Sequence, residues 1–284
     1  MAIGAARTEA IETSIQPRGP YWLSASARRA GDRTRRFRDG VLTCVFETGG
    51  APAHARVWQD SSGAIQIRLQ SPEPEAALEA LRFVLAVDDD HTEFLRRFGS
   101  DRFIGMATFR LRGLRPLRTA TVTHALLRAL CGQLISAREA RRIEARCIAA
   151  AAPVHAGLNL PPNRSTYASW SPARLCSHGL VARKASALVR ISRSFDLERL
   201  RNVPTDAAVR RIEQERMLGP WSAGVICLEG LGRYEQGLVG DLGLMRLCTR
   251  LLGREATVED TVELLRPYGE WAGLASIYLL ASAA

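Results

Sequence analysis

The sequence has almost no lysine. Of its 39 basic residues only Lys184 is a lysine, and all the others are arginines. A GC-rich genome explains the choice of arginine over lysine, but it does not explain why 39 basic residues stand against 29 acidic ones, a net charge of +10. A surplus of guanidinium groups favours phosphate-bearing partners, because the planar fork can hold two phosphate oxygens. Composition alone therefore ranks nucleic acid ahead of acidic proteins as a partner.

Long apolar runs are absent as well. The most apolar stretch, residues 271–284, is shorter than the ~20 residues that a bilayer requires, so we expect no association with a membrane. The first residues include Glu9 and Glu12 and lack the apolar core of a secretory signal. We therefore expect a cytoplasmic protein, associated with the nucleoid if the source is a bacterium.

Closely spaced metal ligands are also missing. No two of the six cysteines form a C-x-x-C pair, and most have apolar neighbours, which is typical of buried thiols in a reducing compartment. Residues 88–91 (Asp-Asp-Asp-His) could form a metal cluster, but Asp90 followed by Glu93 also fits the start of a helix, and this interpretation is favoured. We expect neither a metal nor a cofactor.

The first part of the chain predicts a small α+β domain over residues 18–112. Ile65, Ile67 and Leu69 alternate with polar residues, which indicates a half-buried strand. The turn residues 60–63 separate it from a hairpin partner near Val57, and residues 41–48 predict a further strand. Residues 74–87 have the apolar spacing of an amphipathic helix.

From residue 113 to the end the pattern is helical. Residues 126–134 and 137–151 have helical spacing or composition, and 154–164 is rich in Gly, Pro and Asn, as in a loop. Further helices are predicted near 172–178, 181–195, 205–216, 221–231, 241–252, 257–266 and 270–282. The fold class is therefore mainly α, with an N-terminal α+β domain and an orthogonal helical bundle over 113–284.

The segment around Pro220 predicts two helices joined by a tight hairpin. Proline is well tolerated at the first position of a helix, where its missing N–H would have no partner. The exposed N–H groups of that first turn, aided by the helix dipole, can bind an anion. Taken by itself, this is a common joint between two helices.

Four segments together resemble a known family. Residues 217–223 (Met-Leu-Gly-Pro-Trp-Ser-Ala) resemble the hairpin of the type II DNA-3-methyladenine glycosylases, which belong to the helix-hairpin-helix, Gly/Pro and Asp superfamily of base-excision DNA glycosylases. Residues 239–244 (Val-Gly-Asp-Leu-Gly-Leu) are similar to the family's loop with its essential aspartate. Residues 266–272 (Arg-Pro-Tyr-Gly-Glu-Trp-Ala) and 129–136 (Ala-Leu-Cys-Gly-Gln-Leu-Ile-Ser) resemble two further family segments, in family order.

The chain departs from this pattern at three positions. Met217 stands where the family has the first hairpin glycine, a position that often needs a backbone conformation costly for a residue with a Cβ. Glu215 replaces an apolar residue, and Tyr268 replaces a tryptophan while keeping an aromatic ring.

The resemblance implies a role for each matching residue. Asp241 is the expected catalytic carboxylate, acting on the developing oxocarbenium ion and on a water, with a simple helix N-cap as its alternative. The aromatic rings expected to line the base pocket, where a cationic alkylated purine is attracted, are those of Trp221, Tyr268 and Trp271. For Trp221 the alternative is a packing role at the start of a helix.

The remaining matches concern the DNA itself. Leu134 is expected to fill the gap that a flipped nucleotide leaves in the duplex, with Gln133 beside it, and the alternative is a core leucine. Contacts with the DNA backbone are expected from the hairpin residues Leu218, Gly219, Ser222 and Ala223.

These matches imply a monofunctional glycosylase that excises alkylated bases of the 3-methyladenine type from double-stranded DNA by hydrolysis and acts as a monomer. The bifunctional members of the superfamily place a lysine two residues after the last hairpin glycine, and this position is Trp221 here. The alternatives are a glycosylase for other damaged purines, such as oxidised or deaminated ones, and a non-catalytic helix-hairpin-helix DNA-binding protein, which Met217 suggests.

Overall fold

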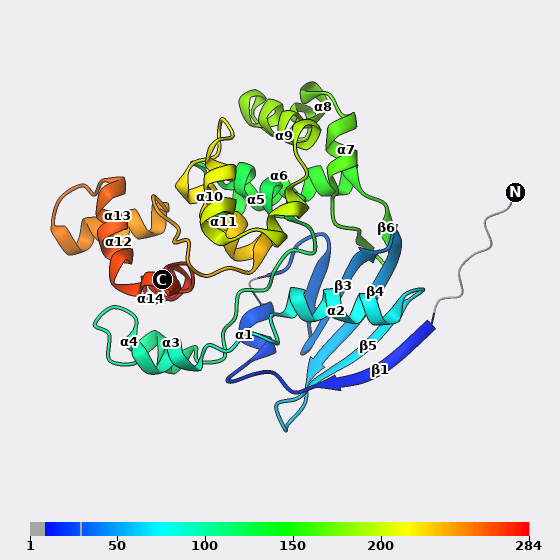
Figure 1. Cartoon of the computed structure of the whole chain (residues 1–284), viewed down its shortest axis with the longest axis horizontal. Coiled ribbons are helices and arrows are strands. Elements are labelled where there is room, and N and C mark those ends of the chain that lie inside the picture. Colours follow the sequence, from blue (N-terminus) through cyan, green and yellow to red (C-terminus); the bar gives the residue numbers. More distant parts are fainter. Residues whose placement is uncertain (1–8, 29, 284) are drawn as a thin grey trace, which may run out of the picture. The chain divides into compact units, whose positions relative to one another are not determined.

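The computed structural model describes residues 9–28 and 30–283, which form two compact units (Figure 1). The sheet unit contains the described residues up to Asp90 together with Gly113–Ala120 and Ile148–Pro161. The helical unit contains His91–Arg112, Thr121–Cys147 and the described residues of Pro162–Ala284. The units therefore differ from the two continuous domains of the sequence prediction: residues 91–112 belong with the helices, and two later segments belong with the sheet.

The sheet unit is built on an antiparallel sheet whose strands follow the order β1-β5-β4-β3-β2. Its elements are β1 (Glu9–Ile15), α1 (Leu23–Ala27), β2 (Arg35–Arg38), β3 (Val41–Thr48), β4 (Ala51–Gln59), β5 (Ile65–Ser71), α2 (Pro74–Leu85) and the short pair β6 (Val154–His155) and β7 (Leu158–Asn159). The strands predicted at 41–48, near Val57 and around Ile65–Leu69 are confirmed, as is the helix from Pro74.

One face of this sheet forms the core of the unit. One apolar cluster contains Ile65, Ile67 and Leu69 of β5 together with Leu81 and Leu85 of α2, and all five are buried. Alternate residues of a strand lie on one face of a sheet, and residues four apart lie on one face of a helix. The strand β1 escaped the sequence prediction, although Ile11 and Ile15 alternate in the same way and pair with Leu69 and Ile65.

The segment Gly113–Ala120 is anchored in the sheet unit by a buried arginine. The Arg115 guanidinium donates hydrogen bonds to the carbonyl oxygens of Ala86 at 2.7 Å and Pro20 at 3.0 Å. Leu117 joins the apolar core. These contacts explain why the chain returns to this unit after residue 112.

The helical unit confirms the mainly α prediction. Its elements are α3 (Thr92–Arg97), α4 (Gly105–Arg110), α5 (Val122–Gly132), α6 (Ala137–Ala151), α7 (Arg164–Ser169), α8 (Pro172–Ser177), α9 (Ala182–Ser194), η1 (Leu197–Asn202), α10 (Thr205–Glu213), α11 (Pro220–Val225), the π-helical turn η2 (Ile226–Leu231), α12 (Leu242–Leu252), α13 (Val258–Leu265), η3 (Arg266–Trp271) and α14 (Ala272–Ala283). Among the described residues, none of the helices is both long and apolar enough to cross a bilayer.

Several of these helices begin at side-chain caps. Thr121 accepts a hydrogen bond from the backbone N–H of His124 at 3.1 Å and starts α5. A reciprocal pair of bonds between Thr257 and Asp260 starts α13. The expected cap at Asp90 is wrong by one residue: His91 occupies the N-cap position of α3, and its buried ring lies edge-on to Tyr234.

Candidate active site

The predicted hairpin is present between α10 and α11. The helix α10 ends at Glu213, and α11 begins at Pro220 as the sequence predicts. Met217 has a φ of +84°, so it keeps the left-handed conformation that a glycine would adopt there. A glutamate replaces an apolar residue at position 215, and its contacts account for this. Glu215 is buried and accepts hydrogen bonds from Arg190 and from Arg211 at 2.8 Å. Burial acts in the opposite direction, but these two guanidinium groups hold the pKa of Glu215 below its usual value.

Of the four hairpin residues expected at the DNA backbone, Gly219 is exposed and the side chains of the other three are buried. The N–H of Leu218 already donates to the Glu215 oxygen at 2.9 Å, and the N–H of Ala223 donates to the Gly219 oxygen at 3.0 Å. This geometry therefore does not support Leu218 and Ala223 as donors to a phosphate. In the first turn of α11, the N–H groups that helix geometry leaves without an intrahelical acceptor are those of Trp221 and Ser222.

Nothing inside the chain requires a glycine at position 219. Its φ of −108° is open to any residue, and an added Cβ would meet no atom within 4 Å. A glycine that packing does not explain is consistent with the close approach of an outside partner to the backbone at this point.

Asp241 and Trp221 are in direct contact. The indole Nε1–H of Trp221 donates to Asp241 Oδ2 at 2.9 Å, across 20 positions of the chain. The other oxygen, Oδ1, accepts the N–H groups of Gly243 at 2.7 Å and Leu244 at 3.4 Å, so Asp241 is also the N-cap of α12. Both residues are half-buried. Asp241 therefore caps α12 through Oδ1, as the alternative role required, while Oδ2 binds a different group, the Trp221 indole.

The indole of Trp221 lies against the end of α5. A Cβ added at Gly132 would come within 2.7 Å of the far edge of the Trp221 ring. The absence of a side chain at Gly132 therefore allows the ring to lie close to the helix. Gly132 is part of the 129–136 segment, but the sequence did not indicate this role for it.

Leu134 follows this helix end and points outward. It is 77% exposed, which excludes the alternative of a core leucine, and its φ is +57°. Gln133 is turned toward the hairpin instead, because its Nε2 donates to the Met217 carbonyl oxygen at 2.7 Å and to Ser222 Oγ at 3.0 Å. Lys184 donates from Nζ to the Gln133 carbonyl oxygen at 2.7 Å, a contact that sequence reasoning missed.

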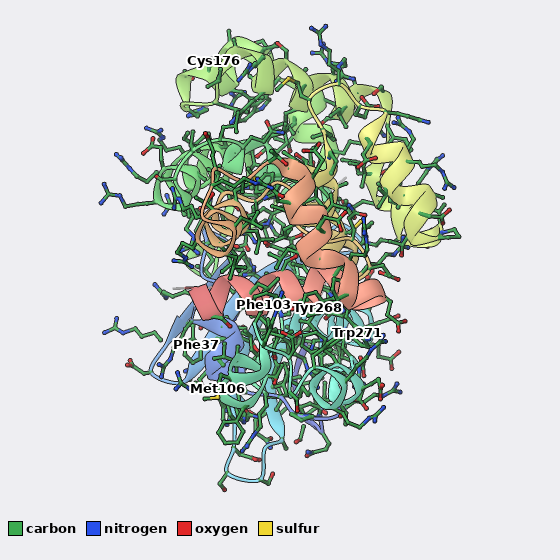
Figure 2. The ribbon with its side chains drawn as sticks, turned by 90° about the vertical axis from the view of Figure 1, so that its left-hand side faces the viewer. Phe37, Phe103, Met106, Cys176, Tyr268 and Trp271 are labelled. Carbon is green, nitrogen blue, oxygen red and sulfur yellow. The ribbon has the colours of Figure 1, made fainter. Side chains whose placement is uncertain are left out.

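The two other expected pocket aromatics lie on the C-terminal segment (Figure 2). Tyr268 is only 1% exposed, and its hydroxyl donates to Asp101 Oδ1 at 3.1 Å, so its ring fixes the chain near α4. Burial raises the pKa of Tyr268. The geometry does not support contact between this ring and a base. Trp271 is half-buried, stacks on Tyr234 at a centroid distance of 6.1 Å, and has a buried Nε1 without a hydrogen-bond partner among the described residues.

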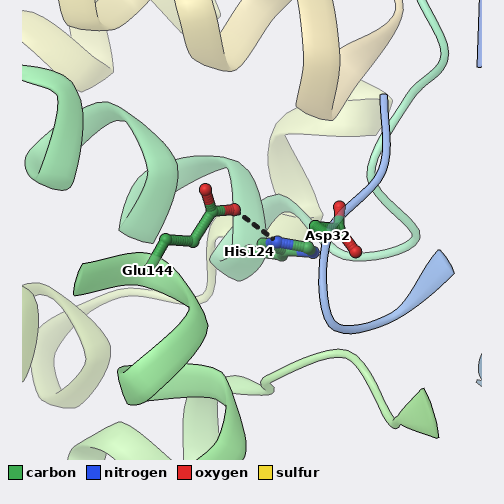
Figure 3. A group of neighbouring side chains, drawn as sticks. All are labelled: Asp32, His124 and Glu144. Atoms are coloured by element: carbon green, nitrogen blue, oxygen red, sulfur yellow. Dashed lines mark hydrogen bonds and ion pairs between the residues drawn. The ribbon is translucent and has the colours of Figure 1, made fainter. Parts of the chain in front are cut away.

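A buried polar network holds α5 in place. His124 Nε2 lies 2.8 Å from Glu144 Oε1, as Figure 3 shows, and Arg128 Nε donates to the same oxygen at 2.9 Å. The same guanidinium also bonds Glu229 of η2. The network therefore joins α5, α6 and η2, and so supports the helix end at which Gln133 and Leu134 lie.

Lys184 does not occupy the position at which the resemblance places a catalytic lysine. It lies on α9, is 5% exposed, and burial lowers its pKa. The position that the family resemblance assigns to the nucleophile of bifunctional enzymes is taken by Trp221, which has no amine.

Comparison with known proteins gives a consistent result. No protein-family model matches the chain. A DNA-3-methyladenine glycosylase of Bacillus subtilis (strain 168) is 22% identical over 209 residues, which cover 68% of this chain and 67% of that protein. The structure of a 3-methyladenine DNA glycosylase from Archaeoglobus fulgidus matches with a TM-score of 0.79 and 21% identity, over 95% of this chain and 97% of that one.

A third match has a different named substrate. The 8-oxoguanine glycosylase/lyase of Clostridium acetobutylicum, in complex with double-stranded DNA containing cytosine opposite 8-oxoguanine, matches with a TM-score of 0.76 and 14% identity over 96% of this chain and 97% of that one. The chain therefore has the fold of the helix-hairpin-helix DNA glycosylases. Among its matches are 3-methyladenine glycosylases from two organisms.

Proposed function

We propose that this protein is a monofunctional DNA glycosylase that excises alkylated bases of the 3-methyladenine type, without a cofactor or metal. The observation that carries the proposal is the pairing of Asp241 with Trp221 at 2.9 Å. It combines an oriented carboxylate with an aromatic ring at the position where a lyase would need a lysine.

Asp241 is suited to stabilise positive charge on the sugar. Its carboxylate is fixed by two backbone N–H groups and one indole N–H, so it needs little reorganisation when an oxocarbenium-like sugar develops beside it. A carboxylate has about four lone-pair sites, so three accepted bonds leave room for a water. Asp241 would orient this water or accept its proton as the water attacks the anomeric carbon.

The proposed substrate and product follow from the aromatic ring of Trp221 and from the missing lysine at that position. An alkylated purine is cationic and already a good leaving group, so stacking and cation–π attraction from Trp221, with Trp271 as a second candidate, supply adequate selectivity. Hydrolysis would leave an abasic site with the strand intact, since Trp221 stands where a bifunctional enzyme has the lysine that forms a Schiff base.

The DNA would be held at the hairpin and at Leu134. Gly219 would allow a phosphate to approach the N–H groups of Trp221 and Ser222. The exposed Leu134 would fill the gap left by the flipped nucleotide.

The test is base release from a panel of duplexes that carry 3-methyladenine, 8-oxoguanine, hypoxanthine or no lesion. We expect release of 3-methyladenine, strand breakage only after alkali, and no adduct with borohydride. Release of 8-oxoguanine in its place would favour the alternative of a glycosylase for other damaged purines, which the match to the Clostridium enzyme supports. Binding without any release would favour a non-catalytic DNA-binding protein.

A further inference from the structure

Two residues with side chains adopt left-handed backbone conformations beside the candidate site. They are Leu134, with a φ of +57°, and Met217, with a φ of +84°. Such conformations cost free energy for any residue with a Cβ, and they persist only where the surrounding structure holds them. The contacts that hold them are therefore informative.

A single chain of hydrogen bonds reaches both positions. Lys184 Nζ donates to the carbonyl oxygen of Gln133 at 2.7 Å. The side chain of Gln133 donates in turn to the carbonyl oxygen of Met217 at 2.7 Å and to Ser222 Oγ at 3.0 Å. The chain thus runs from α9 through the end of α5 to the hairpin.

The first bond acts on the backbone of Leu134. The Gln133 carbonyl belongs to the peptide unit that joins Gln133 to Leu134, and its direction depends on ψ of Gln133 and φ of Leu134. A donor fixed on α9 therefore restrains φ of Leu134. The bond from Gln133 to the Met217 carbonyl restrains the hairpin in the same way.

The identity of the donor also needs an explanation. Lys184 is the one lysine in a chain whose 38 other basic residues (39 minus one) are arginines, and it is 5% exposed. A buried site with one carbonyl acceptor suits the compact ammonium group, with three donors, better than a larger guanidinium with five.

Burying a cation is costly unless it is hydrogen-bonded, and the bond from Lys184 Nζ to the Gln133 carbonyl oxygen offsets part of this cost. That carbonyl is directly followed in the chain by the most exposed large apolar side chain of the described residues, Leu134.

We propose that Lys184 and Gln133 are positioning residues that hold Leu134 ready to enter the duplex and tie it to the DNA-binding hairpin. The proposal rests on the proposed function, because it assigns Leu134 to the gap left by a flipped nucleotide. Neither residue is catalytic, since each acts through the backbone of another.

The test is a double-mutant cycle read by insertion into DNA. The probe is a duplex in which 2-aminopurine neighbours a tetrahydrofuran abasic-site analogue, so that entry of Leu134 unstacks the reporter base and raises its fluorescence. Lys184→Met keeps the length of the side chain and removes the donor. Arg183→Met, at the exposed neighbouring position, is the matched control for loss of one positive charge.

We expect Lys184→Met to reduce the fluorescence gain at saturating protein severalfold, with Arg183→Met close to the parent. In the Leu134→Ala background, Lys184→Met should cause no further loss, because the side chain through which it acts is gone. Gln133→Met provides the same comparison if Lys184→Met does not fold, as judged by thermal melting.

An undiminished signal in folded Lys184→Met, or an equal further loss in the Leu134→Ala background, would overturn the proposal. A parent protein that inserts into the abasic duplex but releases no base would refute the proposed catalysis and leave this cycle interpretable. The two failures are therefore distinguishable.

Discussion

Met217 occupies a backbone conformation that ordinarily belongs to glycine. Its φ of +84° shows that the hairpin keeps its left-handed turn although the residue has a Cβ. The sequence identified Met217 as a departure, but it could not show that Gln133 would hold the Met217 carbonyl at 2.7 Å. A contact between residues 84 positions apart cannot be read from a local pattern.

Met217→Gly should relieve strain without changing the fold. Removing the Cβ gains about 1–2 kcal/mol in the left-handed region, and the greater freedom of glycine in the unfolded chain costs about 0.5–1 kcal/mol, so stability should stay the same or rise by at most about 1.5 kcal/mol. We expect tighter binding of an abasic-site duplex, by up to roughly tenfold, which corresponds to 1.4 kcal/mol. Fluorescence anisotropy titration measures this affinity. Weaker binding by the variant would show instead that the methionine side chain itself contributes to DNA contact.

The motifs assigned residues to one site but did not predict the contacts or the burial of their side chains. Trp221 and Asp241 lie in motifs 20 positions apart, and the structure brings them into contact. Tyr268 was expected in the base pocket but is buried, because its hydroxyl reaches Asp101, 167 positions away. Burial depends on partners from elsewhere in the chain, and the motif around Tyr268 does not contain that information.

At the scale of elements, the close packing of α5 against α11 sets the position of the Trp221 ring. The glycine at position 132 leaves room for the ring, since an added Cβ would lie 2.7 Å from its edge. Because the same indole donates to Asp241, displacement of the ring should also disturb the carboxylate.

Gly132→Ala is therefore expected to slow base excision by about tenfold or more, which corresponds to the ~1.4 kcal/mol of one lost hydrogen bond. The ring edge can move, so thermal stability and affinity for an abasic-site duplex should remain near those of the parent. Single-turnover base release, with melting as the folding control, measures the effect. Parental excision rates would show that the position of the indole does not limit the reaction.

Long elements with a full period were predictable, whereas several short ones were not. The helices α6 and α9 and the strand β3 follow the predicted ranges closely, because each contains enough residues to show its period. The helix α7 and the pair β6–β7 were missed, since a few residues do not display a period and their conformation depends on tertiary contacts.

At the scale of the whole molecule, the excess of positive charge is the dominant feature. A net charge of +10 on 284 residues predicts binding driven by phosphate contacts and counterion release. The logarithm of the duplex association constant should fall linearly with the logarithm of the salt concentration, with a slope of roughly −0.9 for each phosphate neutralised. Titrations across a series of salt concentrations measure this slope. An affinity that does not respond to salt would contradict DNA binding through the backbone.

The division of the chain into units was the part least accessible from the sequence. The predicted change from a mixed to a helical pattern near residue 112 does not coincide with the division into units, because residues 91–112 belong with the helices and Gly113–Ala120 with the sheet unit. Buried contacts within each unit, such as Arg115 with the Ala86 carbonyl and Tyr268 with Asp101, join segments that are far apart in the chain. Neither contact has a sequence signature.

The central claim is that Asp241 does chemistry and does not serve as a cap alone, and Asp241→Asn separates the two roles. Asparagine is as good an N-cap as aspartate, so the bond to the Gly243 N–H should survive. The NH2 group of the asparagine then faces the Trp221 indole N–H, so this bond is lost, at a cost of about 1 kcal/mol in stability. What disappears is the negative charge beside the sugar and the capacity to take a proton from water.

The decisive measurement is single-turnover release of 3-methyladenine by Asp241→Asn, with thermal melting and abasic-duplex affinity as controls. Loss of preorganised electrostatic stabilisation of this kind costs on the order of 10²–10³ in rate, so release should slow by that factor while binding stays near the parental value. A well-folded variant that excises at the parental rate would show that Asp241 is only the cap of α12, and the proposed active site would be wrong.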